Sequence, residues 1–169
     1  SILINQDKPY TNSTAVTLSL KAVDTESGMG RKAQMRFSNN NISWSKPEKF
    51  KPARSWKLIS GDGPKKVYVK FKDAAGNWSP AFFDTITLDT KPPVIVITSP
   101  QNGSTVYTSP ILLEGTVDGV AFSESRVLTE GENVLTKTAT DAAGNTASVS
   151  VTISLQSGEL IGPEGGELT

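Results

Sequence analysis

Apolar and polar side chains alternate one by one in several short segments of this chain. Residues 16–22, 67–72 and 146–153 place an apolar side chain at every second position, with hydroxyl or charged side chains between. Side chains of a β-strand point to opposite faces with a period of two, so each segment is expected to form a half-buried antiparallel strand. No segment shows a helical stripe. The pattern therefore predicts an all-β protein.

Residues that favour turns separate these segments. Asn102-Gly103 and Asp118-Gly119 are two such sequences. Many short strands joined by turns predict a sandwich or a barrel. Pro92-Pro93 follows a strand-like segment and removes two backbone donors, which is typical of a linker. We therefore place a module boundary within residues 89–93.

A five-residue sequence, Asp-Ala-Ala-Gly-Asn, occurs twice, at residues 73–77 and 141–145. An upstream match between residues 10–24 and 107–118 occurs in the same order, which points to duplicated modules. Gly and Asn tolerate positive φ, so the repeated sequence is interpreted as a chain reversal that builds the fold. The second copy is shorter between its two matches, and its module would lack about a hairpin or more.

The predicted domains are residues 1–90, residues 91–156 as a shortened module, and residues 157–169 as a linker or the start of a following domain. Aligning the two copies places Val69 of the first opposite Lys137 of the second, on the inward side of a strand. A lysine at a core position is costly unless it is paired or reaches water. We therefore predict that the second sandwich is incomplete on that side and that Lys137 is partly exposed to water.

Longer motifs surround these repeats. The first module contains residues 10–13, 35–38, 44–45, 67–79 and 84–93, and the second contains residues 99–100, 103–104, 128–133 and the repeated turn. Together they resemble the bacterial immunoglobulin-like modules of surface and secreted proteins. The resemblance implies two consecutive immunoglobulin-like antiparallel β-sandwiches, the second shortened, with an extracellular or cell-surface location. Residues 161–166 resemble the opening of the β domain shared by zonula-occludens proteins and netrin receptors, which implies that another module follows.

Composition limits the chemistry that the chain can perform. It has 17 Lys and Arg residues and 17 Asp and Glu residues, so its formal net charge is zero. A broad basic surface for nucleic acid or anionic lipid is therefore not expected. The sequence holds no Cys and no His, which excludes disulfides, thiolate metal sites, Cys nucleophiles and imidazole ligands.

Catalytic and membrane-spanning motifs are also missing from the sequence. It contains no phosphate-binding Gly loop, no Gly-x-Ser-x-Gly elbow and no metalloprotease motif. No apolar run approaches the roughly 20 residues that cross a bilayer, so no membrane insertion is predicted within the chain. The chain starts at Ser1 without a signal segment and is interpreted as an internal piece of a larger protein. We predict a non-catalytic protein without a cofactor.

Aromatic residues of the first module are candidates for ligand binding. Trp44 and Trp56 can stack on a pyranose ring, with Asn39 and Asn40 beside them as polar neighbours. Large aromatic side chains also fill cores, and this alternative stays open. Calcium is a second candidate ligand, because oxygen ligands in loops or near the module junction can gather around it. The carboxylates concerned are Asp7, Asp24, Glu26, Asp84, Asp89 and Asp118, for which solvated loop positions are the alternative.

These features favour a structural, spacer or adhesion module of a larger bacterial surface or secreted protein. One alternative is a glycan- or protein-binding module that acts through first-module loops or through an exposed strand edge of the shortened module. Another is an accessory domain of a secreted hydrolase. The sequence specifies no partner beyond a glycan or a surface protein, because function belongs to sites placed on such folds.

Overall fold

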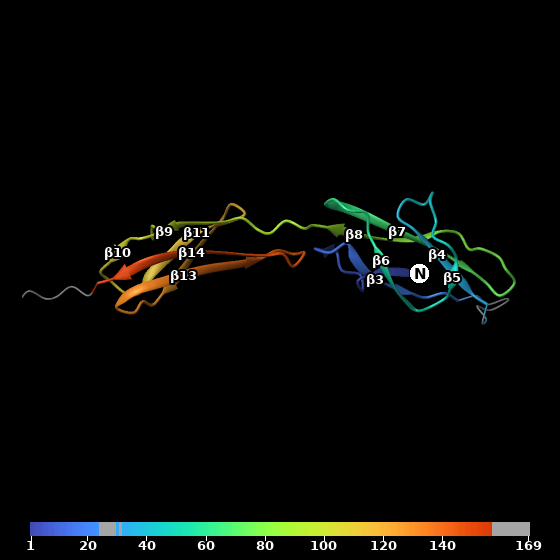
Figure 1. Cartoon of the computed structure of the whole chain (residues 1–169), viewed down its shortest axis with the longest axis horizontal. Helices are drawn as coiled ribbons and strands as arrows, with labels where there is room; N and C mark the ends of the chain where they lie inside the picture. The colour runs from blue at the N-terminus through green and yellow to red at the C-terminus, as the bar shows by residue number, and fades with distance from the viewer. Residues whose placement is uncertain (24–29, 31, 157–169) are drawn as a thin grey trace, which may run out of the picture. The chain divides into compact units, whose positions relative to one another are not determined.

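The computed structural model describes residues 1–23, 30 and 32–156 of the chain. Contacts divide it into two compact units (Figure 1). Unit 1 comprises Ser1–Lys91 together with Ala142–Asn145, and unit 2 comprises the other described residues. Every regular element among the described residues is a β-strand, and none of those residues forms a helix long and apolar enough to span a membrane. The sequence-based prediction of an all-β chain with two immunoglobulin-like sandwiches is confirmed.

Unit 1 is a sandwich of two sheets. The smaller sheet has three strands, in the order β1 (Ile2–Ile4), β3 (Ala15–Leu20) and β6 (Ala53–Lys57). The larger sheet has five, in the order β2 (Tyr10–Thr11), β8 (Phe82–Leu88), β7 (Gly63–Lys72), β4 (Gln34–Ser38) and β5 (Glu48–Lys49). All neighbouring strands are antiparallel except β2 and β8, which are parallel. The first two strands of the chain therefore join different sheets.

The core of unit 1 lies between these sheets and follows the alternation in the sequence. In β7, Val67, Val69 and Phe71 are buried, whereas the residues between them are only partly buried. The buried cluster consists of Ile2, Ile4, Val16, Leu18, Leu20, Met35, Phe37, Leu58, Val67, Val69, Phe71 and Ile86. Burial of each such large side chain contributes about 1.5–3 kcal/mol relative to exposure. One face of each sheet is thereby committed to the interior.

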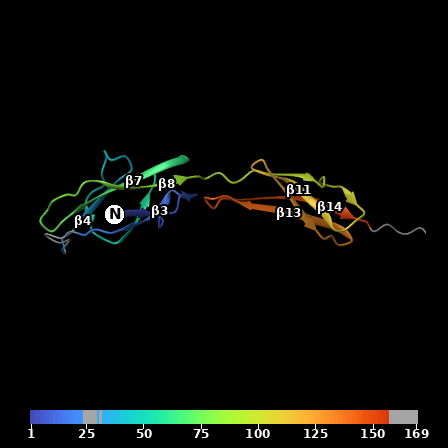
Figure 2. The same ribbon diagram turned by 180° about the vertical axis from the view of Figure 1, so that it is seen from behind.

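Unit 2 is a smaller sandwich with three strands in each sheet. One sheet has the order β12 (Val120–Arg126), β11 (Ile111–Val117) and β9 (Ile95–Ser99). The other has the order β10 (Thr105–Val106), β14 (Thr146–Leu155) and β13 (Gly131–Thr140). The β13–β14 hairpin lies beside the layer of β9 and β11 in both views (Figure 1 and Figure 2). Its buried cluster consists of Leu113, Leu128, Leu135, Val151 and Ile153.

The strand orders of the two units correspond, except that unit 2 lacks counterparts of β4 and β5 among its described residues. In unit 1 these two strands come between β3 and β6. In unit 2 the corresponding strands, β11 and β12, are joined directly by the two-residue turn Asp118-Gly119. Both turn residues have positive φ, 50° and 81°, as a tight hairpin turn requires. This direct hairpin shortens the second sandwich.

The repeated Asp-Ala-Ala-Gly-Asn sequence follows β7 in unit 1 and reverses the chain there. The Asp73 carboxylate accepts the backbone N–H groups of Gly76 and Asn77 at 2.7 and 2.8 Å. The backbone N–H of Asn77 contributes most to lowering the pKa of Asp73, and the Asn77 side chain and the backbone N–H groups of Gly76 and Ala75 lower it further. Gly76 has a φ of 100°, which a residue with a Cβ rarely adopts. The turn thus has the fold-building role that its sequence predicts.

Lys137 points inward from β13, as the aligned repeats predict. Its side chain is 17% exposed and forms an ion pair with Glu124 of β12. Its Nζ also lies 4.6 Å from the ring centroid of Phe122. Because β13 is the outermost strand of its sheet, the Lys137 side chain lies at an open side of the sandwich. The prediction of a partly exposed lysine in an incomplete sandwich is confirmed.

Candidate functional site

The outer face of the five-stranded sheet in unit 1 carries a concentration of cations and aromatic rings. On β7 the residues that alternate with the core positions are Lys66, Tyr68, Lys70 and Lys72. Strand pairing places Arg36 of β4 directly opposite Lys70. We use the name basic–aromatic face for the residues Arg36, Trp44, Lys66, Tyr68, Lys70, Lys72, Trp78 and Phe83.

Arg36 joins two tryptophans on this face. Its guanidinium carbon lies 5.2 Å from the ring centroid of Trp44 and 4.4 Å from that of Trp78. The Lys70 Nζ lies 5.0 Å from the ring centroid of Trp44, and the Lys72 Nζ lies 5.9 Å from that of Trp78. Each cation–π contact of this kind contributes about 0.5–1 kcal/mol at an exposed site. The contacts therefore hold three cations in place over the sheet.

Both tryptophans are positioned by the same local arrangement, in which a serine follows the tryptophan. The Ser45 N–H donates to the Phe37 carbonyl at 2.8 Å, and the Phe37 N–H donates to the Ser45 hydroxyl at 3.0 Å. Ser79 and Phe71 exchange the same two hydrogen bonds at 2.8 and 3.0 Å. Each serine thus ties its loop to the backbone of a strand by two hydrogen bonds, and the tryptophan before it lies over the outer face.

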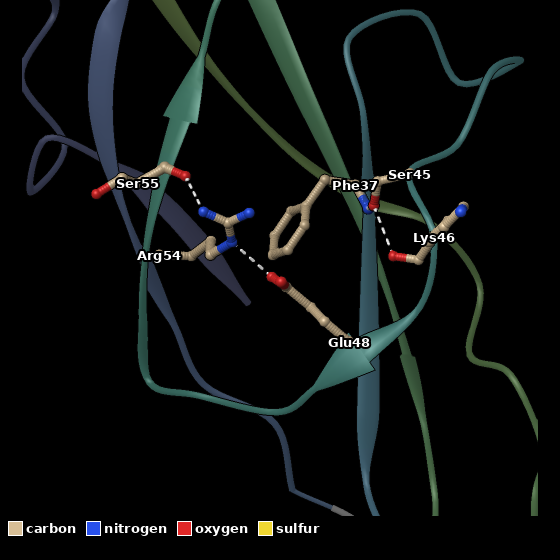
Figure 3. Close-up of polar contacts among 6 residues, drawn as sticks. All are labelled: Phe37, Ser45, Lys46, Glu48, Arg54 and Ser55. Carbon is tan, nitrogen blue, oxygen red and sulfur yellow. Dashed lines mark hydrogen bonds and ion pairs between the residues drawn. The ribbon is translucent and has the colours of Figure 1, made fainter.

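Figure 3 shows the first of these arrangements from the side of the core. The Phe37 ring points from β4 toward β6, while Ser45 lies beside the Phe37 backbone and its hydroxyl donates to the Lys46 carbonyl at 3.2 Å. Arg54 of β6 pairs with Glu48 of β5 at 2.6 Å across the sandwich. The Glu48 carboxylate thus pairs with a cation of the other sheet and not with the cations of the outer face.

Within the part of the chain that the structure describes, the cations of the basic–aromatic face form no ion pair with a carboxylate. Among the described residues, ion pairs join Arg54 to Glu48 and join Glu124 to both Arg126 and Lys137. None of these involves Arg36, Lys66, Lys70 or Lys72. The zero net charge of the chain predicts no broad basic surface, and it does not reveal that these cations are grouped on one face. The charges balance over the whole chain, but the alternation of β7 places three lysines on one side of one strand.

A hollow of about 480 Å³ lies at one end of the same face. Its charged lining residues are the cations Lys32, Lys49 and Lys72 and one carboxylate, Asp73. Lys49 pairs with Gln34 of β4, and Gln34 pairs with Lys72 of β7, so these side chains lie in one row across the sheet. The hollow therefore continues the row of cations beyond the two tryptophans.

A second exposed aromatic pair lies further along β7. The rings of Tyr68 and Phe83 have centroids 5.6 Å apart, and the Lys66 Nζ lies 5.0 Å from the Phe83 centroid. Phe83 is 54% exposed. This aromatic pair thus also has a lysine beside it.

The residues predicted from the sequence to form a ligand site are not gathered in one place. Trp44 belongs to the basic–aromatic face. Trp56 packs against Phe37 of the core, with ring centroids 5.3 Å apart, and its indole N–H donates to the Asn39 amide oxygen at 2.8 Å. Trp56 and Asn39 do line a hollow of about 550 Å³.

The two asparagines have structural partners. The Asn39 amide nitrogen donates to the Lys57 carbonyl at 3.1 Å, so both polar ends of that side chain are engaged. The Asn40 side-chain oxygen accepts the N–H groups of Ile42 and Ser43, each at 2.9 Å. Asn40 therefore stabilises the turn after β4, and its amide oxygen does not face a shared ligand site with Trp44.

Three of the carboxylates considered as calcium ligands each accept a hydrogen bond from a different backbone N–H group. Asp84 accepts the Ile4 N–H, Asp89 accepts the Lys91 N–H, and Asp118 accepts the Val94 N–H. No group of three or more acidic residues that could hold a metal is found in the described part of the chain. Asp24 and Glu26 lie outside the described residues, as does the predicted third domain.

Sequence reasoning missed the four cations of the basic–aromatic face, although two signals for them are present. The first is Lys at alternate positions of a predicted strand, and the second is a Trp-Ser pair that occurs at residues 44–45 and again at 78–79. Neither signal shows by itself that the tryptophans fold back over the strands.

Comparison with known proteins adds information about the fold. No protein-family model matches the chain, and no curated protein matches it. The chain is similar to fibronectin(III)-like modules. One solved structure, described as Clostridium thermocellum CbhA fibronectin(III)-like modules, matches this chain with a TM-score of 0.55 and 13% sequence identity. The similarity covers 99% of this chain and 100% of that one, and it supports the β-sandwich fold seen here.

Proposed function

We propose that the chain is a non-catalytic adhesion module of a larger extracellular bacterial protein and that unit 1 binds its ligand through the basic–aromatic face. The observation that carries the proposal is the set of cations held over two tryptophans on an open sheet face, none of which pairs with a carboxylate among the described residues. Exposed aromatic and cationic side chains grouped on one face are typical of a binding surface. Similarity in fold to fibronectin(III)-like modules is in keeping with a modular, non-catalytic role.

Other outer surfaces of the molecule are chemically different, which strengthens the choice of this face. On the three-stranded sheet of unit 1, the outward residues of β3 and β6 are Ala15, Thr17, Ser19, Ala53, Ser55 and Lys57, of which only the last is charged. On the β13–β14 hairpin, hydroxyl pairs such as Thr136 with Ser150 lie across the strands at 2.9 Å. These surfaces are mostly neutral. A ligand that requires charge therefore has one preferred face.

Binding is tested by immobilising the whole chain and measuring retention of a panel of neutral and acidic polysaccharides by biolayer interferometry. We expect at least one of them to be retained, and the retention to be lost on a sensor that carries a chain with Arg36 and Lys70 both changed to Gln. Absence of any retention across the panel would reject the adhesion role.

A spacer role is the second candidate, and the segment between the two units favours it. The Asp62 side chain accepts the Thr90 N–H at 3.0 Å, which anchors one end of the segment to unit 1. Asp118 and Val94 exchange two hydrogen bonds at 2.8 Å, which anchors the other end to unit 2. The residues between these anchors include Pro92-Pro93, whose rings restrict the backbone.

The spacer role is tested by small-angle scattering on the native chain and on a variant with Pro92 and Pro93 both changed to Gly. If the prolines maintain spacing, the distance distribution of the variant is broader than that of the native chain. Identical distributions would count against this role. An accessory role in a secreted hydrolase predicts the same behaviour for the fragment and is separated from the others by the sequence of the flanking domains.

A further inference from the structure

The chemistry of the basic–aromatic face restricts what can bind there. The outward positions of β4 and β7 hold Arg36, Lys66, Lys70 and Lys72 and no carboxylate. An anionic ligand would therefore meet no opposing charge on these two strands. Lys49 and Lys32 extend the positive charge at one end, around the hollow of about 480 Å³, where the one carboxylate, Asp73, accepts the N–H groups of its own turn. The whole set favours an extended anion over a small one.

The cations follow the direction of one strand. Residues of a β-strand advance by about 3.3 Å each, so the Cα atoms of Lys66 and Lys70 are about 13 Å apart and those of Lys70 and Lys72 about 7 Å apart. Arg36 lies beside Lys70 on the neighbouring strand. A linear polymer with a negative charge at regular intervals can contact these side chains in succession along β7.

The aromatic residues on this face distinguish between classes of polyanion. The rings of Trp44, Trp78 and Phe83 each have at least one cation within 6 Å of the ring centroid. Single-stranded nucleic acid binds by stacking its bases on open rings, and these cations compete for the same ring surfaces. A sugar acid needs less of each ring, because its pyranose C–H groups can contact a ring edge while its carboxylate contacts the neighbouring ammonium or guanidinium.

We infer that the basic–aromatic face binds a linear acidic polysaccharide whose sugars carry carboxylate groups. The inference rests on the proposed adhesion function and names its ligand class. The carboxylates pair with Lys66, Lys70, Lys72 and Arg36, and the sugar rings lie along Trp44, Trp78 and the Tyr68–Phe83 pair. A neutral glycan would contact the aromatic residues only and would leave the cations without a partner.

The test uses the whole chain and two chemically matched probes, carboxymethylcellulose and hydroxyethylcellulose, which share a backbone and differ in charge. The native chain is expected to bind the carboxylated probe, to bind the neutral probe at least about tenfold more weakly, and to lose affinity as NaCl is raised, because salt screens exposed charges. Equal binding of both probes would overturn the inference and would leave an adhesion role based on neutral glycans.

Two double variants locate the binding site. Lys66→Gln with Lys72→Gln removes two cations of the face and is expected to weaken binding about twofold to thirtyfold, the range for two exposed ion pairs. Lys8→Gln with Lys57→Gln makes the same charge change at exposed positions on the side of the three-stranded sheet, where Lys8 lies beside Thr17 and Ser19 of β3, and is expected to leave binding unchanged. Equal effects of the two variants would overturn the assignment to this face, although the adhesion role would stand.

A 20-nucleotide oligo(dT) completes the set as a polyanion of another class. At equal salt we expect it to bind more weakly than carboxymethylcellulose. Binding of equal strength would show a surface for polyanions in general and would overturn the choice of polysaccharide. Unfolding curves of all variants should match that of the native chain, because the four substituted lysines are outside the core. If the native chain retains neither these probes nor any member of the wider panel, the adhesion function itself fails.

Discussion

The strands β7 of unit 1 and β13 of unit 2 occupy the same place in their sheets but have different neighbours. β7 pairs with β8 on one side and with β4 on the other. β13 pairs with β14 and is the last strand of its sheet. The inward position that holds Val69 in β7 holds Lys137 in β13. The difference shows that the loss of a neighbouring strand changes which side chains an inward position can accept.

The energetic reason is access to a partner and to water. Val69 is 0% exposed and lies within a cluster of apolar side chains. Lys137 keeps 17% of its side chain exposed and has the Glu124 carboxylate within contact. A buried charge without a partner is strongly destabilising, whereas a paired one near an edge is tolerated.

The largest effect is expected when this difference is removed by placing a lysine in unit 1. Val69→Lys should destabilise unit 1 by about 3–5 kcal/mol, because the ammonium would be enclosed without a partner. Lys137→Met in unit 2 should change stability by less than about 1 kcal/mol, since Glu124 keeps its pairing with Arg126. All three tryptophans belong to unit 1, so tryptophan fluorescence during urea unfolding reports on that unit. Similar small effects at both positions would show that the two sites are equivalent.

Hydrogen exchange should reveal the same contrast at the level of single amides. The Arg126 side chain reaches the Thr136 carbonyl at 3.4 Å, so this peptide group points away from β14. In an antiparallel pair the N–H and C=O of one residue point the same way. The Thr136 and Thr138 amides should therefore exchange at least about 100-fold faster than that of Leu135. In β7 the corresponding Tyr68 and Lys70 face β4 and should be protected.

Slow exchange at Thr136 and Thr138, measured by NMR, would mean that another segment or a second molecule covers this edge. In that case the open side of unit 2 would not explain why Lys137 is tolerated. The ion pair with Glu124 would then be the remaining reason why Lys137 is tolerated at an inward position.

The sequence predicts the framework of both units better than it predicts the candidate site. The strands follow from period-two alternation, and the turn at residues 73–77 follows from residues that tolerate positive φ. Even the inward lysine can be located, because the two repeats set the register. These features depend on local spacing along the chain, which is visible without the fold.

The basic–aromatic face could not be predicted in the same way. Trp44 and Trp78 come from loops, and each reaches the cations only after its serine has bridged to a strand. That contact joins segments whose pairing the spacing does not specify. Net charge also misled, because it sums over all surfaces and conceals the grouping of cations on one of them.

The repeated turns offer a comparison in which the two units should behave alike. Gly76 and Gly144 have φ values of 100° and 93°, so Gly→Ala at either position introduces backbone strain. Gly76→Ala should destabilise the sandwich that contains β7, and Gly144→Ala the sandwich that contains the β13–β14 hairpin, each by about 1–2 kcal/mol, whereas the exposed Ala75→Ser should have little effect. Calorimetry of the two transitions measures both changes. A cost at one glycine only would show that the two turns differ in spite of their common sequence.

Lowering the pH should destabilise unit 2 before unit 1, and this difference in stability should be smaller than the differences predicted above. The hydrogen bond from Lys137 lowers the pKa of Glu124 from its ordinary value of 4.5, and the Asn77 N–H lowers the pKa of Asp73 from 3.8. In each case the unfolded state binds the proton more readily. The stabilisation is therefore complete above the unfolded value and is lost as the pH falls through the folded one.

Thermal unfolding between pH 7 and pH 3 should consequently show unit 2 losing stability from about pH 4.5 and unit 1 only from about pH 3.8. Glu124→Gln should remove part of the acid sensitivity of unit 2 and leave that of unit 1 unchanged, and Asp73→Asn should do the reverse. If Glu124→Gln left the pH profile of unit 2 unaltered, the Lys137 ion pair would not contribute to its stability. The tolerance of an inward lysine would then depend on contact with water at the open side of β13.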